Sequence, residues 1–326
     1  AYALFNSQTI SYDTAIGYAA LMDNTSGGAN VAVGWCAMEE TTGANQNVAI
    51  GYEALQWGTH VRTIAIGYQS MYDTNAGSTS MASTDNIFIG YKAGGGTWTD
   101  VASNQNVAIG NYSMDSALDG ALKNTGVGYS SLGGITTGDS NTALGHNAGV
   151  SITTGAENIT IGAGSGQTIS NGNYNTILGS SSALSLAGGS YNSIIGRRAG
   201  YGLTSGEYNA ALGTSALYSN QTGQGSVGIG ASAGYSFTGG GGVFMGYEAG
   251  HGVASGDVVF IGYQSGKRAR GTGNTAMGYG SLYGADSTAA NNTGTSNTAI
   301  GQNALRWFLC GSQDLLIQHK TSHGSC

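Results

Sequence analysis

Residues suited to ligand binding gather in two segments, 71–85 and 94–105, that interrupt an otherwise regular sequence. An exposed Trp in a glycine-rich loop, such as Trp98, offers a ring on which a sugar can stack. The alternative is that Trp98 forms a hydrophobic plug over the edge of the fold. Insertions in repetitive folds form loops on one face, often the binding face. The candidate binding residues are Tyr72, Asp73, Trp98 and Asp100.

The acidic residues do not form the pairs on which polysaccharide-cleaving enzymes depend. Such catalysis needs two carboxyl groups, or a carboxylate beside a basic group. The repeat described below places Glu53 beside Gln69 and Glu248 beside Gln264, with no second acid in either pair. The glycine-rich stretch 162–166 lacks the following helix that a phosphate-binding loop requires. We therefore expect no catalytic residues and no enzymatic activity.

Charge and spacing also argue against metals, nucleic acids and membranes as partners. The i, i+4 pair His319 and His323, near Cys326, could ligate a metal on a helix, but chance explains this spacing better. Charged residues make up 8% of the chain and the net charge is −7, so there is no basic surface for a phosphate backbone. No run of 18 apolar residues occurs. We expect no metal, no cofactor, no nucleic acid and no membrane insertion.

A short phrase, Asn-x-Ala-Ile-Gly-x-x-Ala, recurs through nearly the whole chain. Its glycine, here called position 0, appears 17 times, mostly 16 or 17 residues apart. A fixed short period of this kind indicates a solenoid in which each repeat forms one coil. The position-0 glycines are Gly17, Gly34, Gly51, Gly67, Gly90, Gly110, Gly128, Gly145, Gly162, Gly179, Gly196, Gly213, Gly230, Gly246, Gly262, Gly278 and Gly301.

The residues before each glycine predict a short β-strand. Position −1 is always Ile, Val, Leu or Met, as in Ile50 and Ile195, and position −3 is usually Val, Ile or Thr. These two positions share one face of a strand, which we expect to point inward, whereas the varied position −2 points outward. Gly51, Gly145 and Gly196 end such strands, because glycine reaches positive φ at no steric cost.

Two further positions describe the inside of the coil. Position +3 is Ala or Ser in all 17 copies, which is typical of a narrow interior where opposite walls nearly touch. Position −4 is Asn in 12 copies, including Asn47, Asn141 and Asn192. Asn adopts turn conformations readily, and stacked coils would align these side chains into a ladder of amide hydrogen bonds.

The sequence therefore predicts an all-β fold, a parallel β-solenoid of about 17 short coils. A helix is disfavoured because the chain contains 59 Gly and shows no 3.6-residue periodicity. Residues 13–305 form the repeat domain, with a third insertion at 283–296. Residues 1–12 are interpreted as an N-terminal cap or degenerate coil, and 306–326 as a C-terminal cap or the start of a further element.

The interior of such a coil is thin, which predicts lateral association. Two aliphatic side chains and one Ala or Ser per coil must offset a backbone ordering cost of ~1–2 kcal/mol per residue. Small folds in this position usually oligomerise. The expected contact is an outward row of Ala15, Phe88, Phe244 and Phe260 at position −2, joined by the residue after the glycine. The alternative is that the tyrosines after the glycine simply shield the outside of the coil. The tyrosines at that following position are Tyr18, Tyr52, Tyr68, Tyr91, Tyr129, Tyr247, Tyr263 and Tyr279.

The repeat, as in residues 47–54, 106–113 and 297–304, resembles the head repeats of trimeric autotransporter adhesins. The longer form with Thr-Thr-Gly and a Tyr after the glycine (residues 41–52) resembles repeats in bacteriophage tail fibres. The resemblance covers roughly residues 11–305 and implies a left-handed parallel β-roll with three chains side by side. The period of 16 or 17 is longer than in the adhesin repeat. No coiled-coil stalk, membrane anchor or self-cleaving chaperone domain is recognisable.

Together these features predict a non-enzymatic, trimeric attachment fibre. It would present receptor-binding loops to a host polysaccharide or another receptor from an extracellular position, on a virion or a bacterial cell surface. The alternative is a structural extracellular filament, in which coils polymerise or bundle without a specific ligand. A carbohydrate-active enzyme is the third hypothesis.

Overall fold

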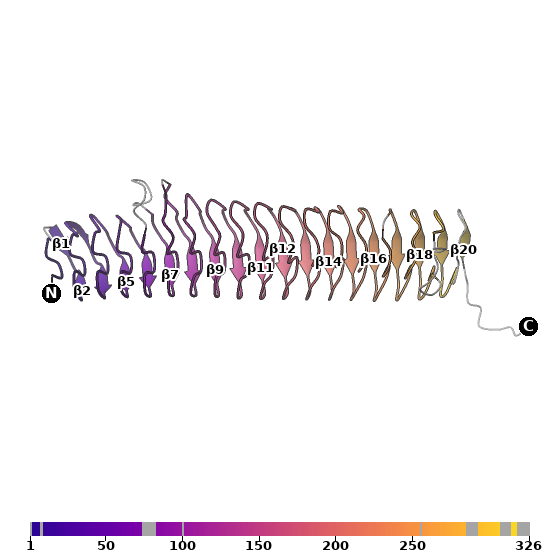
Figure 1. The fold of residues 1–326 in the computed structure, drawn as a ribbon, viewed down its shortest axis with the longest axis horizontal. Helices are drawn as coiled ribbons and strands as arrows, with labels where there is room; N and C mark the ends of the chain where they lie inside the picture. The colour runs from indigo at the N-terminus through magenta and orange to yellow at the C-terminus, as the bar shows by residue number, and fades with distance from the viewer. Residues whose placement is uncertain are drawn as a thin grey trace, which may run out of the picture. The chain divides into compact units, whose positions relative to one another are not determined.

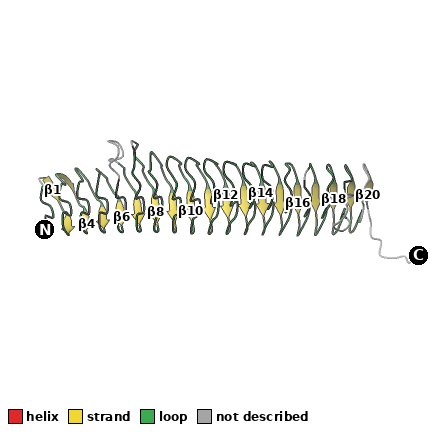
Figure 2. Cartoon of the chain, in the orientation of Figure 1, coloured by secondary structure: helices red, strands yellow, loops and turns green. Residues whose placement is uncertain are grey.

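The structure of the chain, a computed structural model, is built from short parallel strands (Figures 1 and 2). It describes residues 2–6, 9–73, 83–99, 101–254, 256–284, 293–306 and 314–317. Across these ranges there is no helix, and hence no helix that could cross a membrane. The chain divides into two compact units, unit 1 (residues 1–173) and unit 2 (residues 174–326).

Unit 1 contains a stack of nine short strands, with two further strands beside its N-terminal end. The two further strands, β1 and β3, pair with each other in parallel. In chain order the strands are β1 (Thr9–Ser11), β2 (Thr14–Ile16), β3 (Ser26–Gly28), β4 (Val31–Val33), β5 (Val48–Ile50), β6 (Ile64–Ile66), β7 (Ile87–Ile89), β8 (Val107–Ile109), β9 (Thr125–Val127), β10 (Thr142–Leu144) and β11 (Ile159–Ile161).

Unit 2 repeats the same element, each strand again three residues long. Its strands are β12 (Thr176–Leu178), β13 (Ser193–Ile195), β14 (Ala210–Leu212), β15 (Val227–Ile229), β16 (Val243–Met245), β17 (Val259–Ile261), β18 (Thr275–Met277), β19 (Thr298–Ile300) and β20 (Leu315–Ile317).

Within each unit, neighbouring strands pair in parallel and without a shift between equivalent positions. Thr142 of β10 lies opposite Ile159 of β11, and Val243 of β16 lies opposite Val259 of β17. Every one of the 17 position-0 glycines directly follows a strand. The predicted parallel β-solenoid is therefore confirmed, with one strand to each coil except the first two, which also carry β1 and β3.

The position-0 glycine is required by contact between coils as well as by its own backbone angle. At Gly51 φ is 141°, a region that other residues rarely adopt. A Cβ atom added there would lie 2.3 Å from the carbonyl oxygen of Gly67 in the next coil. The same clash recurs at Gly196, whose added Cβ would lie 2.6 Å from the oxygen of Gly213. No side chain fits where successive corners stack this closely.

The predicted asparagine ladder is present, and its members are buried. The Asn141 backbone N–H and Nδ2 both donate to Asn124 Oδ1, at 2.9 and 3.1 Å. Asn141 Nδ2 also donates to the Gly155 carbonyl at 2.8 Å. Its own Oδ1 accepts bonds from the N–H and Nδ2 of Asn158. Asn47 and Asn192 repeat this pattern, so each amide joins its coil to its neighbours.

The predicted inner and outer faces of the strand are wrong, because the two faces are exchanged. From β4 onward the position −2 side chains, including Phe88, Phe244 and Phe260, are fully buried. Ile50 and Ile195 at position −1 point outward and are 38% and 39% exposed. The three-residue strand turns only its middle side chain inward, where it meets the Ala or Ser of position +3. That small position is buried as predicted.

The interior is completed by position +4, whose size compensates for position −2. A small residue at −2 is combined with Leu or Met at +4 in several coils, as in Ala49 with Leu55, Ala65 with Met71 and Ala108 with Met114. Where −2 is Phe, +4 is glycine, as in Phe88 with Gly94, Phe244 with Gly250 and Phe260 with Gly266. A Cβ atom on Gly266 would lie 2.3 Å from the Phe260 ring. The two positions therefore share one interior volume.

The predicted insertions and ends are only partly within the described residues. Most of the first and third insertions lies outside them, as do residues 307–313 and 318–326 with His319, His323 and Cys326. At the N-terminus, β1 pairs in parallel with β3, a coil-like arrangement. Near the C-terminus, β20 continues the stack by pairing with β19.

The shared interior volume predicts strong coupling between Phe260 and Gly266. Phe260→Ala should lower the free energy of unfolding by about 3–5 kcal/mol, because it leaves a cavity. Gly266→Leu alone should also destabilise, because its Cβ meets the ring. The double substitution recreates the Ala49–Leu55 combination and should be more stable than Phe260→Ala alone. Urea unfolding of the four proteins measures this, and losses that simply add would contradict the shared volume.

The asparagine ladder predicts a pH-dependent defect for Asn141→Asp. The carboxylate keeps the shape of the amide but loses both side-chain donors and buries a charge, at a cost of ~3 kcal/mol or more at pH 7. Burial without a cation raises the folded-state pKa of this carboxyl above its unfolded value. The defect should therefore be full above the folded pKa and shrink as pH falls through it.

Urea unfolding at pH 7 and pH 5 checks this prediction. The control is Asn147→Asp in the same coil, where no side-chain hydrogen bond links the amide to the ladder and the change should be about 0.5 kcal/mol or less. Equal losses for the two variants would show that the ladder contributes nothing.

Candidate ligand-binding surface

Trp98, expected as an exposed platform, is fully buried, so this part of the prediction is wrong. Its ring makes edge-to-face contacts with Phe88, at 5.7 Å between centroids, and with His60, at 6.4 Å. Its indole N–H donates to the Gly94 carbonyl at 3.0 Å. Burial lowers the pKa of His60 to about 4, so this histidine is neutral at pH 7. Trp98 therefore acts as a hydrophobic plug, which was the alternative to an exposed sugar-binding ring.

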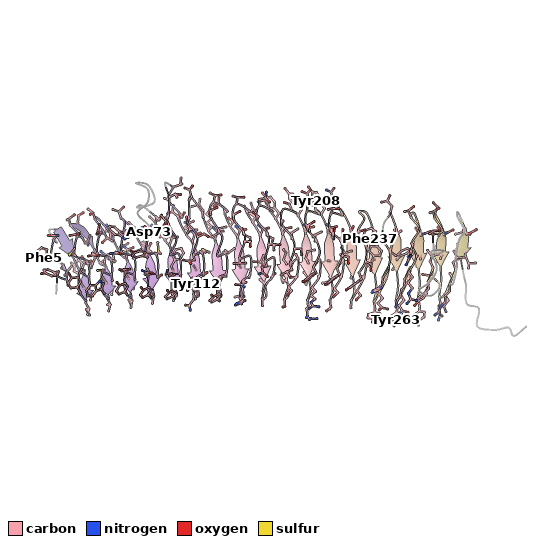
Figure 3. The ribbon with its side chains drawn as sticks, in the orientation of Figure 1. Phe5, Asp73, Tyr112, Tyr208, Phe237 and Tyr263 are labelled. Atoms are coloured by element: carbon pink, nitrogen blue, oxygen red, sulfur yellow. The ribbon has the colours of Figure 1, made fainter. Side chains whose placement is uncertain are left out.

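The two other described candidates, Tyr72 and Asp73, lie at the base of the first insertion and are half-buried. Asp73 is labelled in Figure 3, and its Oδ2 accepts a hydrogen bond of 2.6 Å from the Thr97 hydroxyl. The Asp73 carbonyl accepts one of 3.0 Å from the Trp98 backbone N–H, which joins the two insertions through their backbones. Burial raises the pKa of Tyr72, so its phenol stays protonated at neutral pH. Asp100 lies outside the described residues.

A column of exposed rings, here called the first aromatic ladder, follows the strand ends of unit 1. The predicted outward position of the tyrosines after the glycine is confirmed by their exposure. Between Tyr52, Tyr68 and Tyr91 the rings are stacked, 5.1 and 5.3 Å apart, with planes only 7° and 10° from parallel. Its members are Tyr18, Trp35, Tyr52, Tyr68, Tyr91, Tyr112, Tyr129 and His146.

Unit 2 carries three shorter ladders of the same kind, at three different positions of the coil. Their centroids lie between 4.7 and 5.2 Å apart. Figure 3 labels Tyr208 and Tyr263, which belong to two of these three ladders. The ladders are Tyr174, Tyr191 and Tyr208; Tyr201, Tyr218, Tyr235 and His251; and Tyr247, Tyr263 and Tyr279.

Stacking determines what a ladder can offer to a ligand. A sugar ring packs on the face of an aromatic ring, but each parallel contact covers the faces of both rings that form it. The stacked parts of the ladders therefore present ring edges and phenol hydroxyls to solvent. The spacing of the tyrosines in the sequence was the signal for these columns. Their face-to-face packing depends on the distance between coils, which the sequence does not display.

The acidic residues Glu53 and Glu248 are engaged in contacts between coils. Glu53 accepts a hydrogen bond from Gln69 at 2.8 Å, and Glu248 accepts one from Gln264 at 2.7 Å, as their spacing predicted. Glu248 also pairs with Lys267 at 2.5 Å. Burial opposes ionisation of Glu248, but hydrogen bonds from Lys267 and Gln264 outweigh it and lower the pKa of the carboxyl. Among the described residues, no three His, Cys, Asp or Glu side chains are grouped to hold a metal ion.

Comparison with known proteins gives no match: no family model, curated protein or solved structure is significantly similar to the chain.

The plug role of Trp98 predicts a stability defect on truncation. Trp98→Ala should lower the free energy of unfolding by about 3–5 kcal/mol, because the side chain is fully buried against Phe88 and His60. Tyr12→Ala, which removes a ring that is 93% exposed, should change it by about 0.5 kcal/mol or less. Urea unfolding followed by circular dichroism measures both. A Trp98→Ala protein as stable as the parent would mean that the indole is not a structural plug.

Proposed function

We propose that this chain is a non-enzymatic fibrous attachment protein whose copies pack side by side as trimers. The observation that carries the proposal is an uncharged aliphatic surface along the outer face of the strands. We call it the aliphatic ribbon, and define it in each unit as the side chains at position −1, beside which position −3 is Val, Ile, Ala, Thr or Ser. The proposed location is extracellular, on a virion or a bacterial cell surface.

The aliphatic ribbon is exposed in both units. In unit 1 its side chains include Ile50, Ile109 and Leu144, the last 48% exposed, and no ribbon position in either unit carries a charge. In unit 2 the corresponding exposed residues are Ile195, Leu212, Met245, Met277 and Ile300. A monomeric soluble protein rarely exposes a contiguous apolar surface that continues from coil to coil in this way.

Other copies of the same chain are the partners that fit this surface best. The ribbon is repeated at every coil, so a second copy can match it along the whole length of a unit. The sequence requires Ile, Val, Leu or Met at position −1 in all 17 coils, although that side chain lies outside the coil. A contact between chains explains this strictness, since the interior does not. The resemblance to adhesin heads and tail fibres supports three copies and a left-handed coil.

A binding role for the fibre rests on its loops and surface residues. Tyr72 and Asp73 stay candidates for binding a host polysaccharide or another receptor at the first insertion. The enzyme alternative gains no support from Glu53 and Glu248, since each is paired with a glutamine of the next coil. A purely structural filament would use the same ribbon and differ in its assembly.

Mass photometry of the purified chain tests the proposal. A trimer should have a mass of about 98 kDa, three times the 32.7 kDa of one chain. Ile109→Glu places three charges in the apolar contact and should shift the population to monomers, because a buried unpaired charge costs several kcal/mol. Thr137→Glu, an exposed position of the neighbouring coil away from the ribbon, is the matched control and should stay trimeric. A monomeric parent protein would contradict the proposal, and long filaments in electron micrographs would favour the structural alternative.

A further inference from the structure

A groove of about 450 Å³ opens on unit 1 where one side chain is missing from a row. The row is position +5, occupied by Asp115, Gly133 and Val150 in three successive coils. Gly133 leaves a gap between its two neighbours, and the gap becomes the floor of the groove. A Cβ atom on Gly133 would lie 3.4 Å from a Val150 methyl group, so any larger side chain would fill this space.

Aromatic rings form one wall of the groove, at the point where the first aromatic ladder changes its geometry. The Tyr112 ring is turned by 68° from Tyr91 and by 69° from Tyr129, in edge-to-face contacts. An edge-to-face contact covers the face of only one of its two rings, so more ring face stays open here than along Tyr52, Tyr68 and Tyr91. Tyr112 lies at the outer edge of unit 1 in Figure 3, and Tyr112 and Tyr129 both line the groove.

Polar groups form the rest of the lining. Asp115 and Ser130 both belong to it. Burial raises the pKa of Asp115, and Lys92 and the Gly95 backbone oppose this shift. The attraction of the nearby Lys92 partly offsets the negative charge that Asp115 brings to the groove. A hydrogen-bonding ligand without charge suits such a site better than a cation does.

The groove also adjoins the second insertion. A Cβ atom on Gly95 would lie 2.9 Å from Asp115 Oδ1, and one on Gly96 would meet the backbone of Ser116. The wall that carries Asp115 is therefore packed directly against residues 94–96. These residues begin the insertion 94–105, which the sequence analysis predicted to bind a ligand. Trp98 is buried in that insertion, which leaves the half-buried Tyr112 and the exposed Tyr129 as the rings beside it.

We propose that this groove binds one pyranose unit of a neutral glycan. The C–H face of the sugar packs on the open tyrosine ring, and its hydroxyls bond to the Asp115 carboxylate and the Ser130 hydroxyl. The volume of the groove lies within the range of about 300–1,000 Å³ that is usual for small-molecule sites. The inference rests on the proposed attachment function and names its ligand class.

Saturation-transfer NMR and calorimetry on the full chain test the inference. The probes are glucose, galactose, mannose and N-acetylglucosamine, with choline as a cationic comparison. We expect at least one neutral sugar to bind and choline not to bind. Tyr112→Ala and Asp115→Asn should each lower the affinity for that sugar by about tenfold or more, because each removes a direct contact. Gly133→Leu should abolish binding by filling the floor, and Leu184 shows that the coil accepts leucine at this position.

Tyr68→Ala is the matched control, because it removes an exposed ladder tyrosine whose faces are covered on both sides. Its sugar affinity should equal that of the parent. Circular dichroism and mass photometry of each variant establish that fold and assembly are intact. Binding of none of the four sugars, binding unchanged by all three groove variants, or a preference for choline would overturn the inference. A trimer that fails these tests would leave the proposed assembly standing.

Discussion

The close stacking of glycine corners is the constraint on which the rest of this structure depends. At position 0 the backbone of one coil lies so near the next that a Cβ atom would meet a carbonyl oxygen, at 2.2 Å for Gly17 and Gly34. This contact fixes one point of every coil against its neighbour. The strand before the corner then pairs in parallel with the next strand, and side chains at equivalent positions align into columns.

These columns explain why so few kinds of interaction recur. The buried asparagines form an amide ladder, and the exposed tyrosines stack at about the spacing of the coils. Inside, positions −2 and +4 share one volume in several coils, so that Phe260 is combined with Gly266 whereas Ala49 is combined with Leu55. The groove beside Tyr112 appears where Gly133 interrupts a column. A groove can thus arise where one residue departs from the repeat.

Periodicity alone was enough to predict the fold, the strands and the asparagine ladder. The glycine spacing located 17 strands of the stack but not β20, which no glycine follows, and the strict Ala or Ser of position +3 correctly indicated a narrow interior. The orientation of the strand was wrong because constancy of residue type between copies was taken for burial. Position −1 is aliphatic in every copy, yet Ile50 at that position is exposed. Position −2 varies between copies, yet Phe88 at that position is buried. Trp98 was misplaced for a related reason, since its environment depends on His60 and Phe88 from other coils.

The central claim is that the aliphatic ribbon is covered by other copies of the chain. Hydroxyl-radical footprinting of the native protein, read by mass spectrometry, tests it most directly. The account predicts that Ile50, Ile109 and Leu144 are protected from oxidation, while the similarly exposed Tyr68 and Tyr129 of the same unit react. Oxidation of the ribbon residues at the rates expected from their exposure in a single chain would contradict it.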